Sequence, residues 1–279
     1  MMVLFAEISF YQVKMMQQSE ERLREIRSNR SVHRSSQLLK ILATKRQGIT
    51  LTELSAVSEL PESTVYRLLA TLQHEGLVER ATDGSGRFLM GLEMFRLGSA
   101  VLDRLGIGQQ VLTYLEELAA ETSETVNLGA LHGFHVLYLQ KVESRQTLRA
   151  SLTVGSAEVP AHCSASGKML LSELGQSQLD GLLDAHSLEA QGPNTILTRE
   201  VLLEELQRIR AQGYSIDDLE FAADIRAVAA PIRNHLGITI AAAAVAGPAT
   251  RLSLKRTHAL ASPVMEIAKR ISGRLGFQA

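Results

Sequence analysis

The segment that most constrains the fold is residues 31–90, where helix and turn signals follow one another closely. "SSQLLKILATKRQG" spaces leucine and isoleucine as in a helix and stops at Gly48. "TLTELSAVSEL" opens with Thr50 and has Glu53 three residues later, which is the spacing of a capping box. These patterns predict two helices with a short turn between them.

A third helix is expected in "PESTVYRLLATLQHEGLVER", residues 61–80, because proline suits a first helical position and glycine ends a helix. Its apolar residues recur at i, i+3, i+4 and i+7 and predict a core-facing stripe. They are Val65, Leu68, Leu69 and Leu72. Two short strands around the hairpin turn "DGSG" follow. Three helices and a hairpin in this order predict a winged helix-turn-helix.

The outward side of the third helix carries Ser63, Thr64, Tyr66 and Arg67. Hydroxyl groups reach phosphates or base edges, and arginine pairs with guanine, so this side suits the major groove of DNA. Arginines flanking the hairpin suit contact with the DNA backbone. The alternative is a protein-binding module on the same scaffold, and Glu62 beside this face would repel phosphate. The predicted DNA contacts are Ser63, Thr64, Tyr66, Arg67, Arg80, Arg87, Arg34, Lys45 and Arg46.

Charge is concentrated near the N-terminus although the whole chain has a net charge of −1. Residues 22–52 contain eight basic residues and one acidic residue, which gives 8 − 1 = +7. Such a local block is typical of a contact with nucleic acid. A solvated arm is the alternative, and residues 1–30 are expected to form a charged, frayed or disordered arm.

The rest of the composition is that of a globular protein of 279 residues, 45% of them apolar. A single cysteine, Cys163, allows no intramolecular disulfide and suggests a reducing, cytoplasmic setting. No apolar run reaches the roughly 18–20 residues of a membrane span. Glu7 interrupts the apolar N-terminal stretch, so we expect no signal peptide.

The remaining chain predicts a linker helix and a second domain. Residues 91–106 form an apolar helix that suits packing, including packing against its own copy in a dimer. Residues 107–279 alternate helix-like and strand-like segments, among them "ETVNLGAL", "HVLYLQKV", "TLRASL" and "GITIAAAAVAGP". We predict an α+β domain with a mostly antiparallel sheet, large enough to hold a small-molecule cavity.

Six segments in matching order resemble the IclR family of transcriptional regulators: "SVHRSSQLLKIL", "PESTVYRLLATLQHEGLVER", "ETVNLGAL", "VPAHCSASGKMLL", "GYSIDDLEF" and "IRAVAAPI". The resemblance covers nearly all of residues 31–279. It implies a winged helix-turn-helix at 31–90, a linker helix and a GAF-like domain that binds a small effector. It also implies dimers, often associated as tetramers, on palindromic double-stranded DNA. Members of this family control catabolic operons for organic acids, sugar acids or aromatic compounds, as repressors or activators.

The resemblance places an effector pocket around "PAHCSASGK". Backbone N–H groups near Ala165 and Ser166 open a helix there, and a helix start favours a carboxylate. By position, the implied effector contacts are Leu148, Ser151, Val159, Ala165, Ser166, Asp217, Ile225, Ala227, Ala244 and Ala246.

The chain departs from the family pattern at several of these positions. Ala227 stands where cysteine is usual, Asp224 where glycine is usual, and Ala244 and Ala246 where serines occur in sensors of small acids. An unpaired ligand oxygen in such a pocket costs about 1–3 kcal/mol. We therefore hypothesise an effector less polar than a two- or three-carbon keto acid, or one bound chiefly through the helix start. A screen in which only glyoxylate or pyruvate binds would contradict this.

Two alternatives to the regulator remain at this point. Cys163 precedes a helix start, which can lower the pKa of a thiol, so a cysteine-dependent enzyme is conceivable. A buried cysteine beside a capping or solvent-facing His162 is the simpler interpretation. The histidines show no metal-ligand spacing, and we expect no metal and no cofactor. The second alternative is a ligand-responsive adaptor that binds protein instead of DNA; steep salt dependence would distinguish DNA binding.

Overall fold

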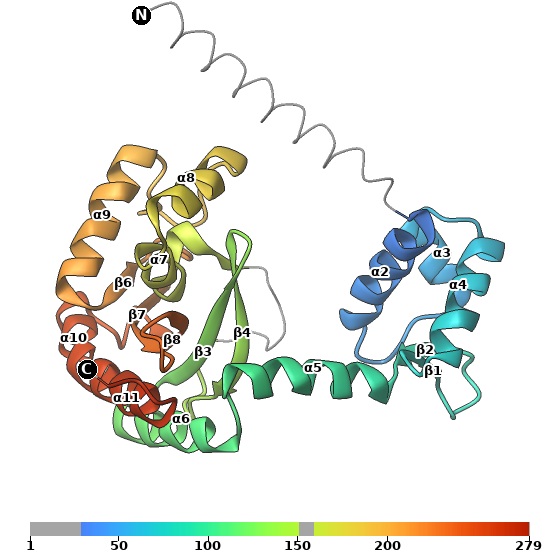
Figure 1. The fold of residues 1–279 in the computed structure, drawn as a ribbon, viewed down its shortest axis with the longest axis horizontal. Helices are drawn as coiled ribbons and strands as arrows, with labels where there is room; N and C mark the ends of the chain where they lie inside the picture. Colours follow the sequence, from blue (N-terminus) through green and yellow to red (C-terminus); the bar gives the residue numbers. More distant parts are fainter. Residues whose placement is uncertain (1–28, 151–158, 279) are drawn as a thin grey trace, which may run out of the picture. The chain divides into compact units, whose positions relative to one another are not determined.

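The computed structural model describes residues 29–150 and 159–278. The chain divides into two compact units, Met1–Val101 and Leu102–Ala279 (Figure 1). Helix α5, Leu92–Leu105, runs across the boundary between them.

The first unit contains three helices and a hairpin. The helices are α2 (Arg30–Ala43), α3 (Leu51–Ser58) and α4 (Glu62–His74), and the antiparallel strands are β1 (Val78–Arg80) and β2 (Phe88–Met90). The winged helix-turn-helix fold is therefore confirmed. Its buried core is formed by Leu38, Leu42, Ile49, Leu54, Val65, Leu69, Leu72, Val78 and Phe88.

The capping box at the start of α3 is present as the sequence predicts. The Thr50 hydroxyl accepts from the Glu53 N–H at 3.3 Å, and the Glu53 carboxylate accepts from the Thr50 N–H at 2.9 Å. The first helix differs from the prediction because α2 ends at Ala43, ahead of Gly48. Gly48 has φ +73° and adjoins Ile49, which bridges to β2.

The second unit is built on a six-stranded antiparallel sheet with the strand order β5-β4-β3-β8-β7-β6. The strands are β3 (Thr125–His132), β4 (His135–Val142), β5 (Val159–Pro160), β6 (Ser215–Asp218), β7 (Ile225–Arg233) and β8 (Thr239–Pro248). The α+β fold class with a mostly antiparallel sheet is thus confirmed.

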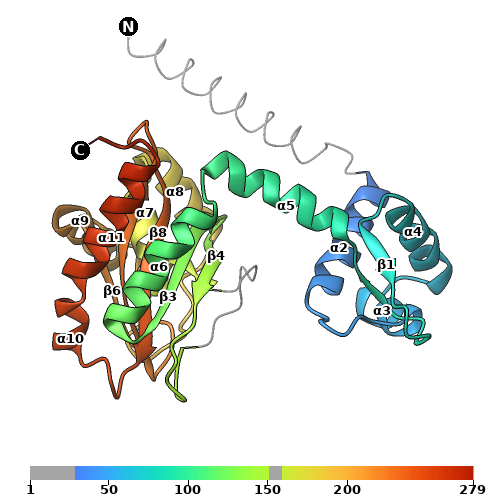
Figure 2. The same ribbon diagram turned by 90° about the horizontal axis from the view of Figure 1, so that it is seen from below.

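Helices cover both faces of this sheet. The helices are α6 (Gln109–Thr122), α7 (Ala165–Ser172), α8 (Gln176–Ala185), α9 (Arg199–Gln212), α10 (Leu254–Ala259) and α11 (Ala261–Arg274). Helices α6 and α11 pack on one face, and α7, α8 and α9 pack over the other (Figure 2). A short 3-10 turn, Ala161–Cys163, leads into α7.

The alanine-rich strand β8 shows how the sequence supports two cores. Ala241, Ala243 and Val245 belong to the core under α6 and α11, whereas Ala242 and Ala244 belong to the core under α7. A strand buried on both faces is apolar throughout, which is why this segment lacks polar alternation. The small side chains leave room above the sheet for the cavity described below.

Two local expectations differ from the structure. In "TLRASL", residues 147–150 form no strand, and residues 151 and 152 lie outside the described part. The closing segment is two helices that meet at Leu260, and Pro263 lies in the first turn of α11 instead of bending a single helix. Within residues 29–150 and 159–278, no helix has the length and apolarity needed to cross a membrane.

Candidate nucleic-acid interface and ligand cavity

Helix α4 presents the outward face that the sequence predicts. Val65 and Leu69 are fully buried, while Ser63, Tyr66 and Arg67 are exposed. Tyr66 is large and apolar in part, yet 54% of it is exposed. Thr64 is half-buried, so it lies at the border of this face. Three of the four α4 candidates are therefore exposed and accessible to the major groove of DNA.

The basic residues before α4 form a segment without acids. Residues 29–52 contain Arg30, Arg34, Lys40, Lys45 and Arg46 and no aspartate or glutamate. Lys45 and Arg46 are exposed in the turn after α2, and Arg34 is half-buried on α2. The part of the predicted basic block before residue 29 lies outside the described residues.

The hairpin arginines have different surroundings. Arg80 is exposed, and its guanidinium lies 5.0 Å from the centre of the Phe88 ring. Arg87 is half-buried; its Nη1 donates to the Gly48 carbonyl at 2.9 Å and lies 3.8 Å from the Glu53 carboxylate. Arg87 thus fastens the hairpin to the start of α3, a structural role that the sequence did not indicate.

The second unit contains a cavity of about 110 Å³ between the sheet and the start of α7. Eight predicted effector contacts line it: Val159, Ala165, Ser166, Asp217, Ile225, Ala227, Ala244 and Ala246. Leu148 does not line it; this residue is 60% exposed, and its carbonyl accepts from Arg251 at 2.7 Å. Ser151 lies outside the described residues.

The start of α7 supplies hydrogen-bond donors to the cavity. The Ser164 hydroxyl accepts from the Gly167 N–H at 3.2 Å and so caps the helix. The N–H groups of Ala165 and Ser166 have no acceptor among residues 29–150 and 159–278. Gly167 lets the start of α7 lie close to the preceding 3-10 turn, because a Cβ at Gly167 would lie 2.3 Å from the Ala161 backbone. Two free N–H groups at a helix start are suited to an anion.

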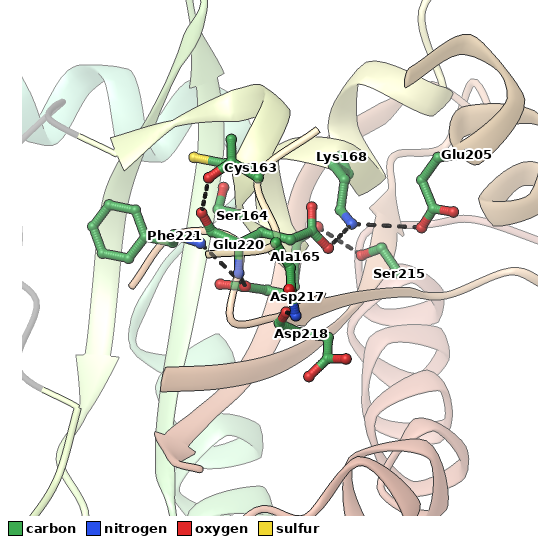
Figure 3. Close-up of polar contacts among 12 residues, drawn as sticks. Cys163, Ser164, Ala165, Lys168, Glu205, Ser215, Asp217, Asp218, Glu220 and Phe221 are labelled. Atoms are coloured by element: carbon green, nitrogen blue, oxygen red, sulfur yellow. Dashed lines mark hydrogen bonds and ion pairs between the residues drawn. The ribbon is translucent and has the colours of Figure 1, made fainter. Parts of the chain in front are cut away.

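Asp217 is the acidic group of the cavity and is only 2% exposed. Its Oδ1 accepts from the N–H groups of Glu220 at 2.8 Å and Phe221 at 3.3 Å (Figure 3). Burial raises the pKa of Asp217 to about 7, and the nearby Glu220 carboxylate adds to the shift. A carboxyl group of this kind changes its charge near neutral pH.

A buried ion cluster holds the turn that follows Asp217. Lys168 on α7 is 1% exposed; its Nζ donates to Glu220 and lies 3.5 Å from the Glu205 carboxylate (Figure 3). Burial raises the pKa of Glu220, and Lys168 opposes that rise. Because Glu220 also donates its N–H to Asp217, the cluster links helix α7 to the cavity.

Sequence reasoning missed five residues that line the cavity: Asn127, Tyr138, Ala150, Ser164 and Phe221. Burial raises the pKa of Tyr138, and Asp217 raises it further, so its hydroxyl remains protonated. Phe221 packs against the small apolar cluster of Val136, Tyr138 and Val159. The sequence offers one signal for Asn127, because an asparagine is unusual inside the mainly apolar strand segment "TVNLGAL".

Cys163 and His162 are both buried, and each has a different backbone carbonyl as its partner. Burial raises the pKa of Cys163 to about 12, and its thiol donates to the Pro160 carbonyl at 3.6 Å. His162 is 1% exposed and neither caps a helix nor faces solvent; its Nε2 lies 3.0 Å from the Glu189 carbonyl. The buried-cysteine interpretation holds, whereas the expected position of His162 was wrong. Within the described part of the chain, no group of three or more potential ligands is placed to hold a metal.

A helix-turn-helix unit joined to a unit with a donor-lined cavity defines a ligand-responsive transcriptional regulator. Comparison with known families agrees: residues 31–82 match the IclR helix-turn-helix domain, and residues 99–273 match the family described as bacterial transcriptional regulator IclR C-terminal. The chain belongs to the IclR family of bacterial transcriptional regulators. The family comprises regulators and not enzymes, in keeping with the buried Cys163.

Individual relatives are similar over most of their length. The chain is 34% identical over 243 residues to the HTH-type transcriptional regulator BhcR of Paracoccus denitrificans, covering 87% of this chain and 86% of that protein. It is 31% identical over 244 residues to the transcriptional repressor IclR of Escherichia coli, covering 87% and 88%. The crystal structure of the Thermotoga maritima IclR has a TM-score of 0.71 and 28% identity, over 89% of this chain and 99% of that one.

Proposed function

We propose that this regulator binds operator DNA through the outward face of α4 and that a small organic acid in the cavity changes that binding. The observation that carries the first half is the exposed Ser63, Tyr66 and Arg67 beside an acid-free basic segment. The free N–H groups at the start of α7 carry the second half. DNA is the target, so the place of action is the cytoplasm.

The roles of the hairpin and flanking residues are part of this proposal. Arg80 is exposed and serves the DNA backbone, together with Lys45 and Arg46 in the turn after α2. Arg34 and Arg87 are half-buried and contribute their remaining donors. Thr64 contacts DNA from the border of the α4 face.

A homodimer on a palindromic operator is also proposed. Leu92 and Phe95 on α5 are 81% and 77% exposed, which is unusual for large apolar side chains. A second copy that covers these residues would bring two copies of α4 to two half-sites. The association of such dimers as tetramers is a further proposal, and the mass from light scattering distinguishes these states.

The test of DNA binding is a titration of the full chain with the intergenic DNA next to its own coding region. Binding is measured at two salt concentrations, with unrelated DNA as competitor. We expect preference for the intergenic fragment and a steep loss of affinity as salt rises, because phosphate contacts release counterions. Equal binding to both DNAs at each salt, with a panel of acids unable to change it, would favour the protein-binding adaptor.

Arg67→Ala is the sharpest single variant for this interface. If Arg67 pairs with a base, its loss costs about 1–3 kcal/mol of binding free energy, roughly 5- to 150-fold in affinity. Arg145→Ala is the matched control because Arg145 is exposed in the second unit and carries the same charge. A loss for Arg67→Ala no larger than that of the control would remove Arg67 from the contact set.

A further inference from the structure

Asn127 is the one residue of the described cavity wall whose buried acceptor lacks a partner. It lies on β3 between Val126 and Leu128, which face the core under α6 and α11. Its side chain therefore faces the α7 side, where it lines the cavity and is 1% exposed. Its Oδ1 is buried and has no hydrogen-bond partner among residues 29–150 and 159–278.

A buried acceptor without a donor costs folding free energy, so the burial of Asn127 Oδ1 requires a physical explanation. The neighbouring Thr125 shows that the strand can satisfy such groups. Its hydroxyl donates to the Ala150 carbonyl at 3.2 Å and accepts from the Ser144 N–H at 3.2 Å. Asn127 differs from Thr125 in facing the cavity, where a ligand can supply the missing donor.

The other walls of the cavity define what that ligand carries. Ala165 and Ser166 present free N–H groups, which suit a carboxylate. Ala227, Ala244 and Ala246 present only methyl groups, which suit an apolar body. Asp217 is a second acceptor whenever it is ionised. The cavity thus has N–H donors for an anion at the start of α7 and, at Asn127 and Asp217, acceptors that need a donor.

We propose that the effector is a hydroxylated carboxylic acid whose hydroxyl donates a hydrogen bond to Asn127 Oδ1. This rests on the proposed acid effector and specifies its class. A deoxy acid leaves Oδ1 unpaired, and a keto acid sets a second acceptor against it. Sites built to bond a substrate hydroxyl discriminate strongly against analogues that lack it.

The experiment is calorimetric titration of the full chain with matched pairs of acids that differ in one hydroxyl. The pairs are glycolate and acetate, lactate and propionate, 3-hydroxybutyrate and butyrate, and 3-hydroxybenzoate and benzoate, with pyruvate as the keto acid. At least one hydroxy acid should bind tenfold or more tightly than its deoxy partner and more tightly than pyruvate. In Asn127→Val this preference should fall to less than twofold.

The same variant gives a second readout that does not depend on the ligand. Because valine removes an unpaired acceptor, ligand-free Asn127→Val should melt at a higher temperature than the wild type. Thr125→Val is the matched control on the same strand and face. It breaks two hydrogen bonds, so it should melt at a lower temperature and retain the preference for the hydroxy acid.

The outcomes separate this inference from the function on which it rests. Pairs that bind equally, tighter binding of pyruvate, or a preference that survives Asn127→Val would overturn the role of Asn127 while leaving an acid-binding site. Binding of none of these acids would overturn the acid effector itself and this inference with it. Neither result would alter the DNA titration.

Discussion

At the scale of single residues, Asp217 should make stability depend on pH in a direction opposite to that of most carboxyl groups. Its pKa is raised from 3.8 to about 7 in the folded protein, chiefly by burial. Between these values the unfolded chain releases the proton and the folded chain keeps it. The free energy of unfolding is therefore unaffected by Asp217 below about pH 4, where the carboxyl is protonated in both states. It falls as pH rises from about 4 to about 7, because ionisation is costly only in the folded state.

Asp217→Asn removes this dependence, because asparagine has no proton to lose and its oxygen still accepts from Glu220 and Phe221. Between pH 4 and pH 8 the variant should gain up to about 4 kcal/mol relative to the wild type, since each pKa unit is worth about 1.4 kcal/mol. Urea unfolding followed by circular dichroism across this range measures the change. Asp218→Asn, one position along β6, is the control and should keep the wild-type fall with pH. A fall as large in Asp217→Asn as in the wild type would show that burial does not raise the pKa of Asp217, whereas a smaller remaining fall is expected from Glu220, whose pKa is also raised.

The cavity residues that could be predicted from the sequence are those whose positions match the pattern of the IclR family. Ala227, Ala244 and Asp217 fall on the wall for that reason. Asn127 was missed because the sequence does not show that β3 is covered on both faces, so a polar residue there looks solvent-facing. For Cys163 the simpler interpretation, a buried cysteine, was correct, because a helix start lowers a thiol pKa only where burial does not raise it more.

At the scale of elements, the capping box of α3 supports the helix against which α4 packs. Thr50→Ala removes the hydroxyl that accepts from the Glu53 N–H and should cost about 0.5–2 kcal/mol. Hydrogen exchange of the amides in residues 50–74 measures this locally, and exchange should speed up. Thr52→Ala is the control, because Thr52 is exposed within α3 and is not its cap. Equal exchange in the two variants would show that the cap contributes nothing.

Elements with a local signal were predictable, and their exact bounds were not. The Thr50 cap and the apolar spacing of α4 are fixed by neighbours in sequence, and both are present. Helix α2 instead begins at Arg30, because the Asn29 side chain accepts from the Ser31 N–H at 3.0 Å. The sequence instead predicts a charged arm over residues 1–30, because the density of charge there hides the capping signal of Asn29.

At the scale of the whole molecule, one helix joins the two units. Helix α5 follows β2 after Gly91, where a Cβ would lie 2.1 Å from the Gly76 carbonyl oxygen. At its other end Leu102 packs on the core of the second unit. An effector regulates only if it favours one arrangement of the chain over another. The stiffness of α5 between its two ends is therefore expected to affect how strongly the two sites are coupled.

Gly98 lies inside α5 and offers a direct test of that coupling. A Cβ at Gly98 would meet nothing within 4 Å, so Gly98→Ala adds no clash. Alanine favours a helix over glycine by roughly 1 kcal/mol and so stiffens α5. The effector's affinity for the DNA-free protein should stay the same, because Gly98 does not line the cavity. The factor by which the effector changes DNA affinity should differ from that of the wild type. DNA titrations with and without saturating effector measure this factor.

Gly181→Ala is the matched control, since Gly181 lies inside α8 and its Cβ would likewise meet nothing within 4 Å. This variant stiffens a helix that does not join the units and should leave the coupling factor unchanged. Coupling is reciprocal, so saturating DNA must change effector affinity by the same factor in each protein. A factor shifted equally by both variants would point to a general effect of stability. A factor unchanged in Gly98→Ala would mean that the signal passes without bending α5, through rigid movement of the helix or through the second copy in a dimer.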